Sequence, residues 1–565
     1  MSQNKPIGYI VGGGLKESFR VRLTVPSSEI QEGAFVTISS GDLQFYGLVT
    51  DLQLGSTDPR FADEQTENRL PSILSKSLHG QTLFTNLEIL PALMLDRGPD
   101  PASPDYEDWL ERTGDQVPRP MPVKTVPRHH AEVRLADEGD IAEIFGNPGE
   151  KANFAIGYTR EQHHPVCIDL DKFVQRSSGV FGATGTGKSF LTRLTLAGLI
   201  NRDSASILIF DMHNEYGFDD TASDTGKKVI GLKTKFKSRV QVVGLGGGAL
   251  IRGQTPDYNL EIAMGDIEPF DIELLTRELN LRETTSNTLN ALRTSFSKDW
   301  FKRFKAMNRE TVMEEDQNGK LKPVPHPDSV AAWAEENGVN VMAAEGLHDK
   351  LRRLFNKSYI VQEPAVDSVK EIVKSLDAGK NVILSFGKFE TDLDYLLVSN
   401  LLTRKIREQW ERKTNRYRTG ESEEPRPLVL VIEEAHKLLG KDIANQTAFA
   451  SIAREMRKYY VTLLIIDQRP SQINDEVMSQ LGTRISGWLG DEDDIHAVLS
   501  GLAGRDSLRG MLARLQQKEE VILLGWGVPM PIPVRSRRYD DQFWKDLNID
   551  KQDKREKIIK DELGY

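Results

Sequence analysis

The chain has 565 residues, too many for one hydrophobic core, so about three or four structural units are expected. With 38% hydrophobic and 28% charged residues, its composition is that of a soluble globular protein, and no apolar run is long enough to span a bilayer. The net charge of -11 does not indicate nucleic-acid binding, although it leaves room for positive charge confined to a channel.

The amino-terminal part of the chain has the pattern of a small β-barrel. Short β-rich runs separated by turn residues cover 7–11, 20–25, 34–39 and 45–51. Residues 97–127 are dense in Pro, Asp and Glu and predict a loop, after which strand character resumes at 130–135 and 153–158. We therefore predict a first domain over 1–165.

From Cys167 onward the sequence pattern changes to that of alternating strands and helices. Four continuous apolar runs, as expected of parallel strands covered on both faces, cover 206–211, 382–386, 428–432 and 461–466. Long helical stretches such as 392–413 separate them, which predicts an α/β fold with a parallel sheet over 166–254 and 376–527. Between these two parts, 255–375 is predicted to be a helical insertion with polar stretches around 310–327. Residues 528–565 are predicted to be a separate carboxyl-terminal segment, whose charged tail from Tyr539 to Tyr565 is expected to be helical and to lie outside the sheet.

The most informative motif is G-A-T-G-T-G-K-S at Gly182–Ser189, a complete Walker A phosphate loop. An apolar lead-in before it and helical spacing after it place bound phosphates at a helix amino terminus, which disfavours a chance glycine-rich turn. Lys188 would contact the β- and γ-phosphates and Ser189 would bind Mg²⁺. The predicted nucleotide-binding residues are Gly182, Ala183, Thr184, Gly185, Thr186, Gly187, Lys188, Ser189 and Phe190.

Two carboxylates follow the strand at 428–432 and form a Walker B arrangement. Glu433 would hold a water of the Mg²⁺ shell, and Glu434 would polarise the water that attacks the γ-phosphate. The alternative is an acidic start to the next helix that complements the helix dipole. The five apolar residues before the pair favour the catalytic interpretation.

Polar residues also end the neighbouring strands. Asp211 or Glu215 would support the metal ion or the attacking water, with local capping by Asp211 as an equal alternative. Gln468 would sense the γ-phosphate, and its alternative is to cap the loop before Pro470.

A basic cluster closes the helix before the strand at 461–466. Arg454 and Arg457 are ordinary partners for a helix carboxyl end, but either, and preferably Arg457, could act as an arginine finger in a neighbouring subunit's site. This interpretation implies an oligomer.

Other patterns carry less chemistry. The glycines at 12–14 and 244–248 predict turns, because neither run leads into a phosphate-loop lysine. The pairs His129-His130 and His163-His164 lack partners at metal-ligand spacing. The basic and aromatic run at 300–305 predicts an amphipathic helix packed in the insertion rather than a DNA-binding strip. The single cysteine and an amino terminus without an apolar segment predict a cytoplasmic protein.

The ordered set of motifs resembles the HerA family, which belongs with FtsK among RecA-like DNA-translocating ATPases. A barrel precedes G-A-T-G-T-G-K-S, I-F-D-M-H-N-E-Y, L-V-L-V-I-E-E-A-H, R-E-M-R-K-Y-Y and D-Q-R-P-S-Q-I, and the resemblance covers nearly the whole chain. It implies a HerA-type barrel, a RecA-like core, a helical insertion and a carboxyl-terminal brace after 528–534. The chain departs from the family's Walker B motif at Glu433, where the family usually has aspartate. This difference puts the hydrolysis rate and the metal preference in question.

The resemblance further implies a homohexamer that uses ATP and Mg²⁺, with double-stranded DNA in its pore. A separate nuclease of the NurA type, or a nuclease or sirtuin-type effector of antiphage defence, would dock on the barrel. We find no nuclease motif in this chain. The first hypothesis is therefore an ATP-driven DNA translocase or helicase for DNA-end processing or defence. The second is a ring scaffold that regulates an effector without sustained translocation. A third, a monomeric P-loop kinase, lacks a lid motif and an acceptor site.

Overall fold

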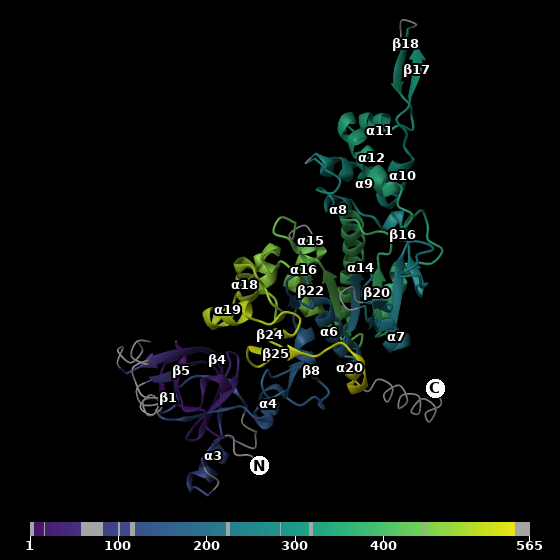
Figure 1. Ribbon diagram of the computed structural model, residues 1–565. Coiled ribbons are helices and arrows are strands. Elements are labelled where there is room, and N and C mark those ends of the chain that lie inside the picture. The colour runs from purple at the N-terminus through teal and green to yellow at the C-terminus, as the bar shows by residue number, and fades with distance from the viewer. Residues whose placement is uncertain are drawn as a thin grey trace, which may run out of the picture.

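The computed structural model describes residues 5–15, 17–57, 83–99, 102–113, 119–221, 226–282, 284–315, 320–443 and 447–547. Three parts follow one another along the molecule, with the amino-terminal barrel at one end, a large mixed sheet in the middle and a helical arm at the other end (Figure 1). Within these described ranges, no helix is long and apolar enough to cross a membrane.

The amino-terminal barrel is confirmed. Over the described residues its sheet has the order β2-β1-β7-β3-β4-β5-β6, and a further pairing of β2 with β5 closes six of these strands into a barrel. Alternate side chains point inward and form a core of their own, with Phe19 and Phe45 in edge-to-face contact at 6.2 Å. The strands are β1 Gly8–Gly12, β2 Phe19–Leu23, β3 Phe35–Ser40, β4 Leu43–Ser56, β5 Leu83–Asp96, β6 Met121–Pro122 and β7 Glu132–Leu135.

Two helices accompany the barrel. The predicted loop at 97–127 contains α3, Asp105–Thr113, whose first turn is acidic as the helix dipole favours. After β7 comes α4, Glu138–Phe145, which begins with a capping box between Asp137 and Asp140. Phe145 of α4 packs against Phe35 of the barrel at 5.9 Å, so α4 links the barrel to the next part.

The middle of the molecule is a sheet of twelve strands among the described residues, in the order β15-β14-β20-β11-β21-β22-β10-β23-β24-β25-β8-β9. From β15 to β23 neighbouring strands run parallel, which confirms the predicted RecA-like core, and from β23 to β9 they run antiparallel. The parallel strands are β10 Ser178–Phe181, β11 Ser206–Asp211, β14 Val240–Leu245, β15 Tyr258–Leu260, β20 Asn381–Ser385, β21 Leu428–Glu433, β22 Val461–Asp467 and β23 Thr483–Ser486.

The predicted domain boundary at 165 is wrong. Strands β8, Asn153–Tyr158, and β9, Pro165–Asp169, belong to the large sheet, where β8 pairs with β25, Ile532–Ser536, and β25 pairs with β24, Glu520–Gly525. Short antiparallel strands look alike in sequence whether they close a barrel or extend a sheet, so only the pairing places β8. The boundary therefore lies between α4 and β8, and part of the predicted brace at 528–565 is a strand of the sheet.

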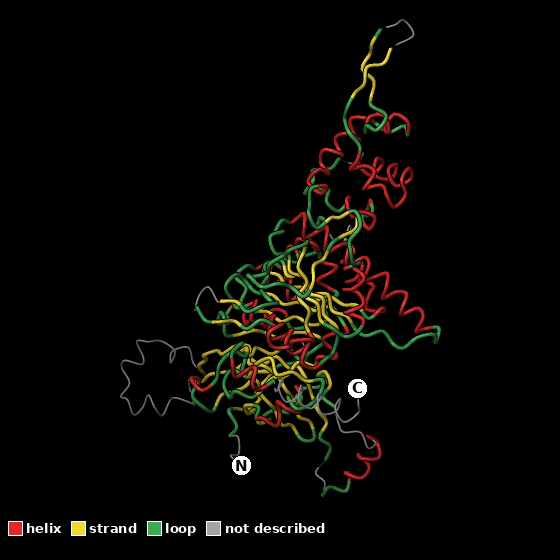
Figure 2. The backbone as a smooth tube through the Cα atoms, turned by 90° about the vertical axis from the view of Figure 1, so that its right-hand side faces the viewer, coloured by secondary structure: helices red, strands yellow, loops and turns green. Residues whose placement is uncertain are grey.

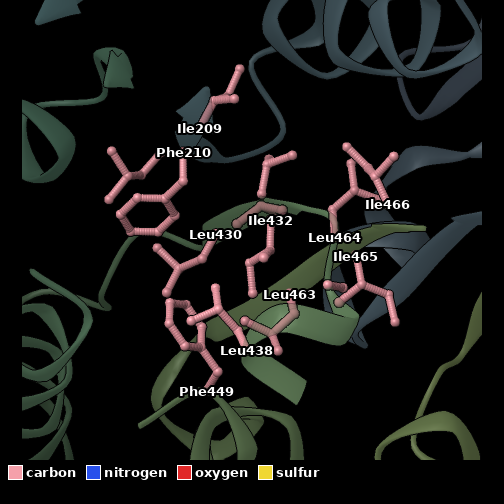
Figure 3. Packing of buried hydrophobic residues seen from close by; sticks show 14 of the residues in the cluster. Ile209, Phe210, Leu430, Ile432, Leu438, Phe449, Leu463, Leu464, Ile465 and Ile466 are labelled. Carbon is pink, nitrogen blue, oxygen red and sulfur yellow. The ribbon is translucent and has the colours of Figure 1, made fainter. Parts of the chain in front are cut away.

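Apolar side chains lock the central strands to their covering helices. Figure 3 shows side chains of β11, β21 and β22 packed with Leu438 of α15, His436–Leu439, and Phe449 of α16, Ala448–Glu455. Phe210 and Phe449 meet edge to face at 5.9 Å. The predicted helix at 392–413 is confirmed as α14, Asp392–Arg418. This rigid layer fixes the carboxyl ends of the strands, where the polar residues stand.

The helical insertion forms the far arm of the molecule (Figure 2). Its predicted amphipathic helix at 300–305 is confirmed as α10, with Trp300, Phe301 and Phe304 fully buried. The polar stretch around 310–327 is a β-hairpin rather than helix or loop, and β15 and α13, Ser368–Asp377, belong with the sheet. The insertion contains α8 Pro269–Glu273, α9 Thr285–Phe296, α10 Trp300–Ala306, β17 Thr311–Glu315, β18 Leu321–Pro325, α11 Val330–Glu336, α12 Val341–Phe355 and the pair β16 Ile262–Ala263 with β19 Ile360–Val361.

The carboxyl-terminal segment returns to the phosphate loop. After β25, helix α20, Asp541–Asp546, brings Phe543 and Trp544 into the main core. Tyr539 lies beside Phe190 of the Walker A helix, with ring centroids 6.3 Å apart. The rest of the predicted helical tail, 548–565, lies outside the described residues.

Candidate nucleotide site

The Walker A loop joins β10 to α6, Lys188–Arg202. Gly185 and Gly187 adopt φ values of 78° and 90°, left-handed conformations that a side chain would strain. The Thr186 hydroxyl donates to the carbonyl of Ala183 at 2.7 Å and so fixes the turn. The loop therefore has the backbone shape of a phosphate cradle at a helix amino terminus.

Three strand ends bring Glu434 and Gln468, two of the predicted catalytic residues, together at this loop. The Lys188 Nζ lies 3.8 Å from Glu434 Oε1, and Gln468 Nε2 donates to the same oxygen at 2.9 Å. The Thr184 hydroxyl donates to Gln468 Oε1. Because β22 lies between β10 and β21, the residue after β22 reaches both the phosphate loop and Glu434. This arrangement favours the sensor interpretation of Gln468 over loop capping.

The backbone at Glu434 is strained. Its φ is 46°, in a region that residues with side chains rarely occupy. Such conformations persist only where the surrounding structure enforces them. Here the buried strand β21 precedes the residue and α15 follows it, so the carboxylate is held beside Lys188.

Glu433 and Asp211 lie at the ends of neighbouring strands and are both buried. Burial, with the nearby Asp211 and Glu215 charges, raises the pKa of Glu433 well above its usual value, while the Tyr216 hydroxyl and Lys188 oppose this shift. Burial also raises the pKa of Asp211 to about 6. Two adjacent buried carboxylates resist joint ionisation, so a cation beside them would be stabilising.

The oxygens of these two carboxylates are used differently. Asp211 Oδ1 accepts from the backbone amide of Glu215 at 2.8 Å, and Oδ2 accepts from that of Tyr216 at 3.1 Å. This is the local capping role that the sequence left open. Glu433 Oε2 is buried and has no hydrogen-bond partner among the described residues.

This unpaired oxygen fits a metal-side role for Glu433, with Ser189 at the start of α6 as the second protein group. Over the described residues no cluster of three or more His, Cys, Asp or Glu side chains could hold a metal ion. A magnesium ion that takes most of its ligands from phosphates and water needs no such cluster. The predicted metal-supporting role of Asp211 has no such support, because both of its carboxylate oxygens accept backbone amides.

A pair of His436 with the buried Asp467 lies beside Glu434 and was not predicted from the sequence. Asp467, fully buried at the end of β22, accepts from the His436 backbone amide at 2.8 Å, and its Oδ2 lies 3.0 Å from His436 Nδ1. The hydrogen bond to Asp467 raises the pKa of His436, and His436 in turn lowers the pKa of Asp467. Asp467 ends a strand as Asp211 does, which marks it as a polar residue at this edge of the sheet but does not identify His436 as its partner.

This pair predicts a pH-dependent contribution to stability. The raised pKa of His436 gives stability that is complete below about pH 6.5 and lost as pH rises, and the lowered pKa of Asp467 gives stability lost below about pH 4. We expect His436→Gln to destabilise the protein by about 1.5–3 kcal/mol near pH 5.5 and by less near pH 9. Thermal unfolding midpoints of both proteins across this range test it; an equal difference at both pH values would contradict the ion pair.

The two predicted arginines precede β22, whereas Gln468 follows it, so the length of the strand separates them from this cluster. Arg454 ends α16 and pairs with Glu476 at 3.2 Å, and Arg457 is exposed in the 3-10 turn Met456–Tyr459 that follows. Phe190 is half-buried between Tyr539 and Arg193, whose guanidinium lies 5.5 Å from its ring.

A phosphate loop, two strand-end glutamates and a strand-end glutamine on a parallel sheet define a P-loop ATPase of RecA-like fold. Residues 154–406 match the family model "Helicase HerA, central domain". The chain is 24% identical to the DNA double-strand break repair helicase HerA of Sulfurisphaera tokodaii, covering 95% of this chain and 94% of that one. It is also 24% identical to its counterpart in Sulfolobus acidocaldarius, covering 98% and 97%. Residues 154–406 therefore form the central domain of a HerA-type helicase, and the chain is an ATP-hydrolysing enzyme.

Solved structures give a more distant likeness. The plasmid coupling protein TrwB, in complex with a non-hydrolysable ATP analogue, has a TM-score of 0.46 and 15% identity. That match covers 72% of this chain and 93% of the TrwB chain.

Proposed function

We propose that this protein is an ATP-driven DNA translocase or helicase that works as a homohexamer with double-stranded DNA in its pore. The observation that carries the proposal is the cluster of Lys188, Glu434, Gln468 and Thr184, which joins the phosphate loop to two neighbouring strand ends. The similarity to double-strand break repair helicases over nearly the whole chain supports DNA as the polymer along which the protein would move.

The cluster explains how nucleotide binding would make Glu434 available for catalysis. Without phosphate, the Lys188 ammonium has the Glu434 carboxylate as its nearby counter-charge. A γ-phosphate would attract Lys188 and leave Glu434 to accept a hydrogen bond from the attacking water. Gln468 contacts both Thr184 and Glu434, so it would pass the change at the phosphate to the strand β22. A magnesium ion held by Ser189 and, through water, by Glu433 would neutralise charge on the phosphates.

The direct test is ATP hydrolysis by the purified protein with and without linear duplex DNA. We expect DNA to stimulate the turnover and the protein to displace a triplex-forming strand from the duplex in an ATP-dependent way. Failure of DNA to change the ATPase rate, together with no strand displacement, would contradict the translocase.

Arg457 provides a prediction about the ring. Its exposed position after α16 leaves the guanidinium available to a neighbouring subunit, where it would stabilise charge on the transferred phosphate. We expect Arg457→Ala to lower kcat by about 10³–10⁵ while nucleotide binding stays nearly unchanged.

Mixing this variant with Lys188→Ala subunits provides a check on the Arg457 prediction. Some interfaces of mixed rings pair an intact phosphate loop with an intact Arg457, so mixing should restore part of the activity. A variant that remains fully active, or mixtures that recover nothing, would argue against a trans-acting Arg457.

The barrel is the proposed docking site for a separate nuclease or defence effector. It lies at the opposite end of the molecule from the insertion (Figure 1). Glu32 of the barrel is tied to the ATPase part by its carbonyl, which accepts from Arg160 at 2.8 Å, and by its carboxylate, which pairs with Arg514 at 2.9 Å. These contacts would couple a partner on the barrel to the ATPase. Deleting 1–146 should abolish partner binding while leaving a nucleotide-binding core.

One observation favours the second candidate, a ring scaffold with slow hydrolysis. Glu433 is buried with a pKa raised well above its usual value, which weakens its hold on a hydrated cation. A scaffold would assemble on ATP, bind its effector and show little DNA-stimulated turnover. The DNA-stimulated ATPase assay therefore separates the two candidates.

A further inference from the structure

Two carboxylates end adjacent strands beside the phosphate loop, and only one has a free oxygen. The register pairs Phe210 of β11 with Ile432 of β21, so Asp211 and Glu433 follow at the same edge. Both Asp211 oxygens accept backbone amides of the turn after β11. Its carboxylate is therefore occupied by the fold, which leaves Glu433 as the acceptor available to a ligand.

Glu433 is held by two tyrosines that touch different parts of it. The Tyr216 hydroxyl donates to the carboxylate Oε1 at 2.7 Å, whereas the Tyr395 hydroxyl donates to the main-chain oxygen at 2.9 Å. Both rings are buried, at 1% and 0% exposure. Only the contact from Tyr216 controls how the carboxylate is turned.

Tyr216 is itself fixed by the nucleotide-binding framework. Its backbone amide donates to Asp211, and Arg193 of α6 places its guanidinium 5.8 Å from the tyrosine ring. The same arginine donates to the Glu215 carbonyl at 2.6 Å. The helix that starts at the phosphate loop therefore holds the turn that carries Tyr216.

A glutamate needs such a restraint more than a shorter side chain does. Its carboxylate turns about one more bond than that of aspartate, and ordering a free glutamate costs rotamer entropy. A neutral hydroxyl that occupies Oε1 removes this freedom without bringing a positive charge that would compete with a metal ion. It leaves Oε2 as the single buried oxygen without a partner in the described residues around Glu433.

We propose that Tyr216 is a positioning residue for the metal-side carboxylate: its hydroxyl holds one oxygen of Glu433 so that the other faces the hydrated divalent cation of the bound nucleotide. This inference rests on the proposed ATPase site and adds the residue that sets its metal affinity. Neighbours of metal-binding groups commonly change metal affinity by about 10–100-fold when they are removed.

The two tyrosines provide a matched pair of variants. Tyr216→Phe and Tyr395→Phe each remove one buried hydroxyl that contacts Glu433, so their folding costs should be similar. We expect Tyr216→Phe to raise the Mg²⁺ concentration for half-maximal ATPase by about 10-fold or more. Tyr395→Phe should change it by less than about 2-fold, and ADP affinity in EDTA should be unchanged in both.

A measurement independent of turnover separates this inference from the proposed function. Mn²⁺ binding in the presence of ADP, followed by electron paramagnetic resonance, should weaken in Tyr216→Phe and not in Tyr395→Phe, even in a protein that hydrolyses ATP slowly. In a Glu433→Asp background the shorter side chain loses the Tyr216 contact, so adding Tyr216→Phe should have no further effect. Equal Mn²⁺ affinity in wild type and Tyr216→Phe, or equal losses in both tyrosine variants, would overturn the proposal.

Discussion

Lys188→Ala is expected to abolish ATP hydrolysis, with kcat lower by at least about 10²–10³. The variant removes the only lysine of the phosphate loop, which begins α6 and lies 3.8 Å from Glu434. The variant loses the positive charge that binds the β- and γ-phosphates. It also loses the counter-charge that Glu434 has before nucleotide binds. Nucleotide affinity, measured with a fluorescent ATP analogue, should fall as well.

The control is Lys437→Ala. Lys437 lies three residues after Glu434, but its ammonium pairs with Asp392 at 2.8 Å. Its loss should leave most of the ATPase activity. Substantial hydrolysis by Lys188→Ala would place the nucleotide elsewhere and would remove the basis of the proposed function.

Glu434→Gln is expected to lower hydrolysis by about 10²–10⁴ while nucleotide binding is retained. Glutamine keeps the shape of the side chain and can keep a contact with Gln468, but it cannot accept a proton from the attacking water. Single-turnover measurements should show ATP bound and uncleaved, so the protein should remain in its ATP-bound form.

Glu408→Gln is the control, because it is the same substitution at a glutamate outside the nucleotide site. Its carboxylate lies on the exposed part of α14, where it approaches Arg404 at 3.7 Å. That variant should behave like the wild type. If Glu434→Gln turned over at the wild-type rate, another group would have to orient the water.

The parts of the site that the sequence predicted are those that local chemistry specifies. The phosphate loop needs glycines where φ is positive, and Gly185 and Gly187 have that conformation. The parallel strands needed continuous apolar runs, and β11, β21 and β22 are buried along their whole length.

The contacts that the sequence did not reveal are made between distant segments. Tyr216 and Glu433 are 217 positions apart, and a buried tyrosine gives no local sign of its partner. Asp467 looks like any strand-end carboxylate until His436 is placed beside it. The strand β8 was assigned to the barrel because its partner, β25, is encoded near the other end of the chain.

The pairing of β8 with β25 has a consequence for biosynthesis. Tyr158 lies opposite Arg535, so this edge of β8 stays without its neighbour until Ile532–Ser536 has been synthesised. Unpaired strand edges invite association with other chains, and long-range pairing is slow to form. Nascent chains would therefore expose an unpaired, aggregation-prone strand edge during translation. Carboxyl-terminal truncations that remove β25 should accumulate as insoluble material even though every nucleotide-binding motif is present.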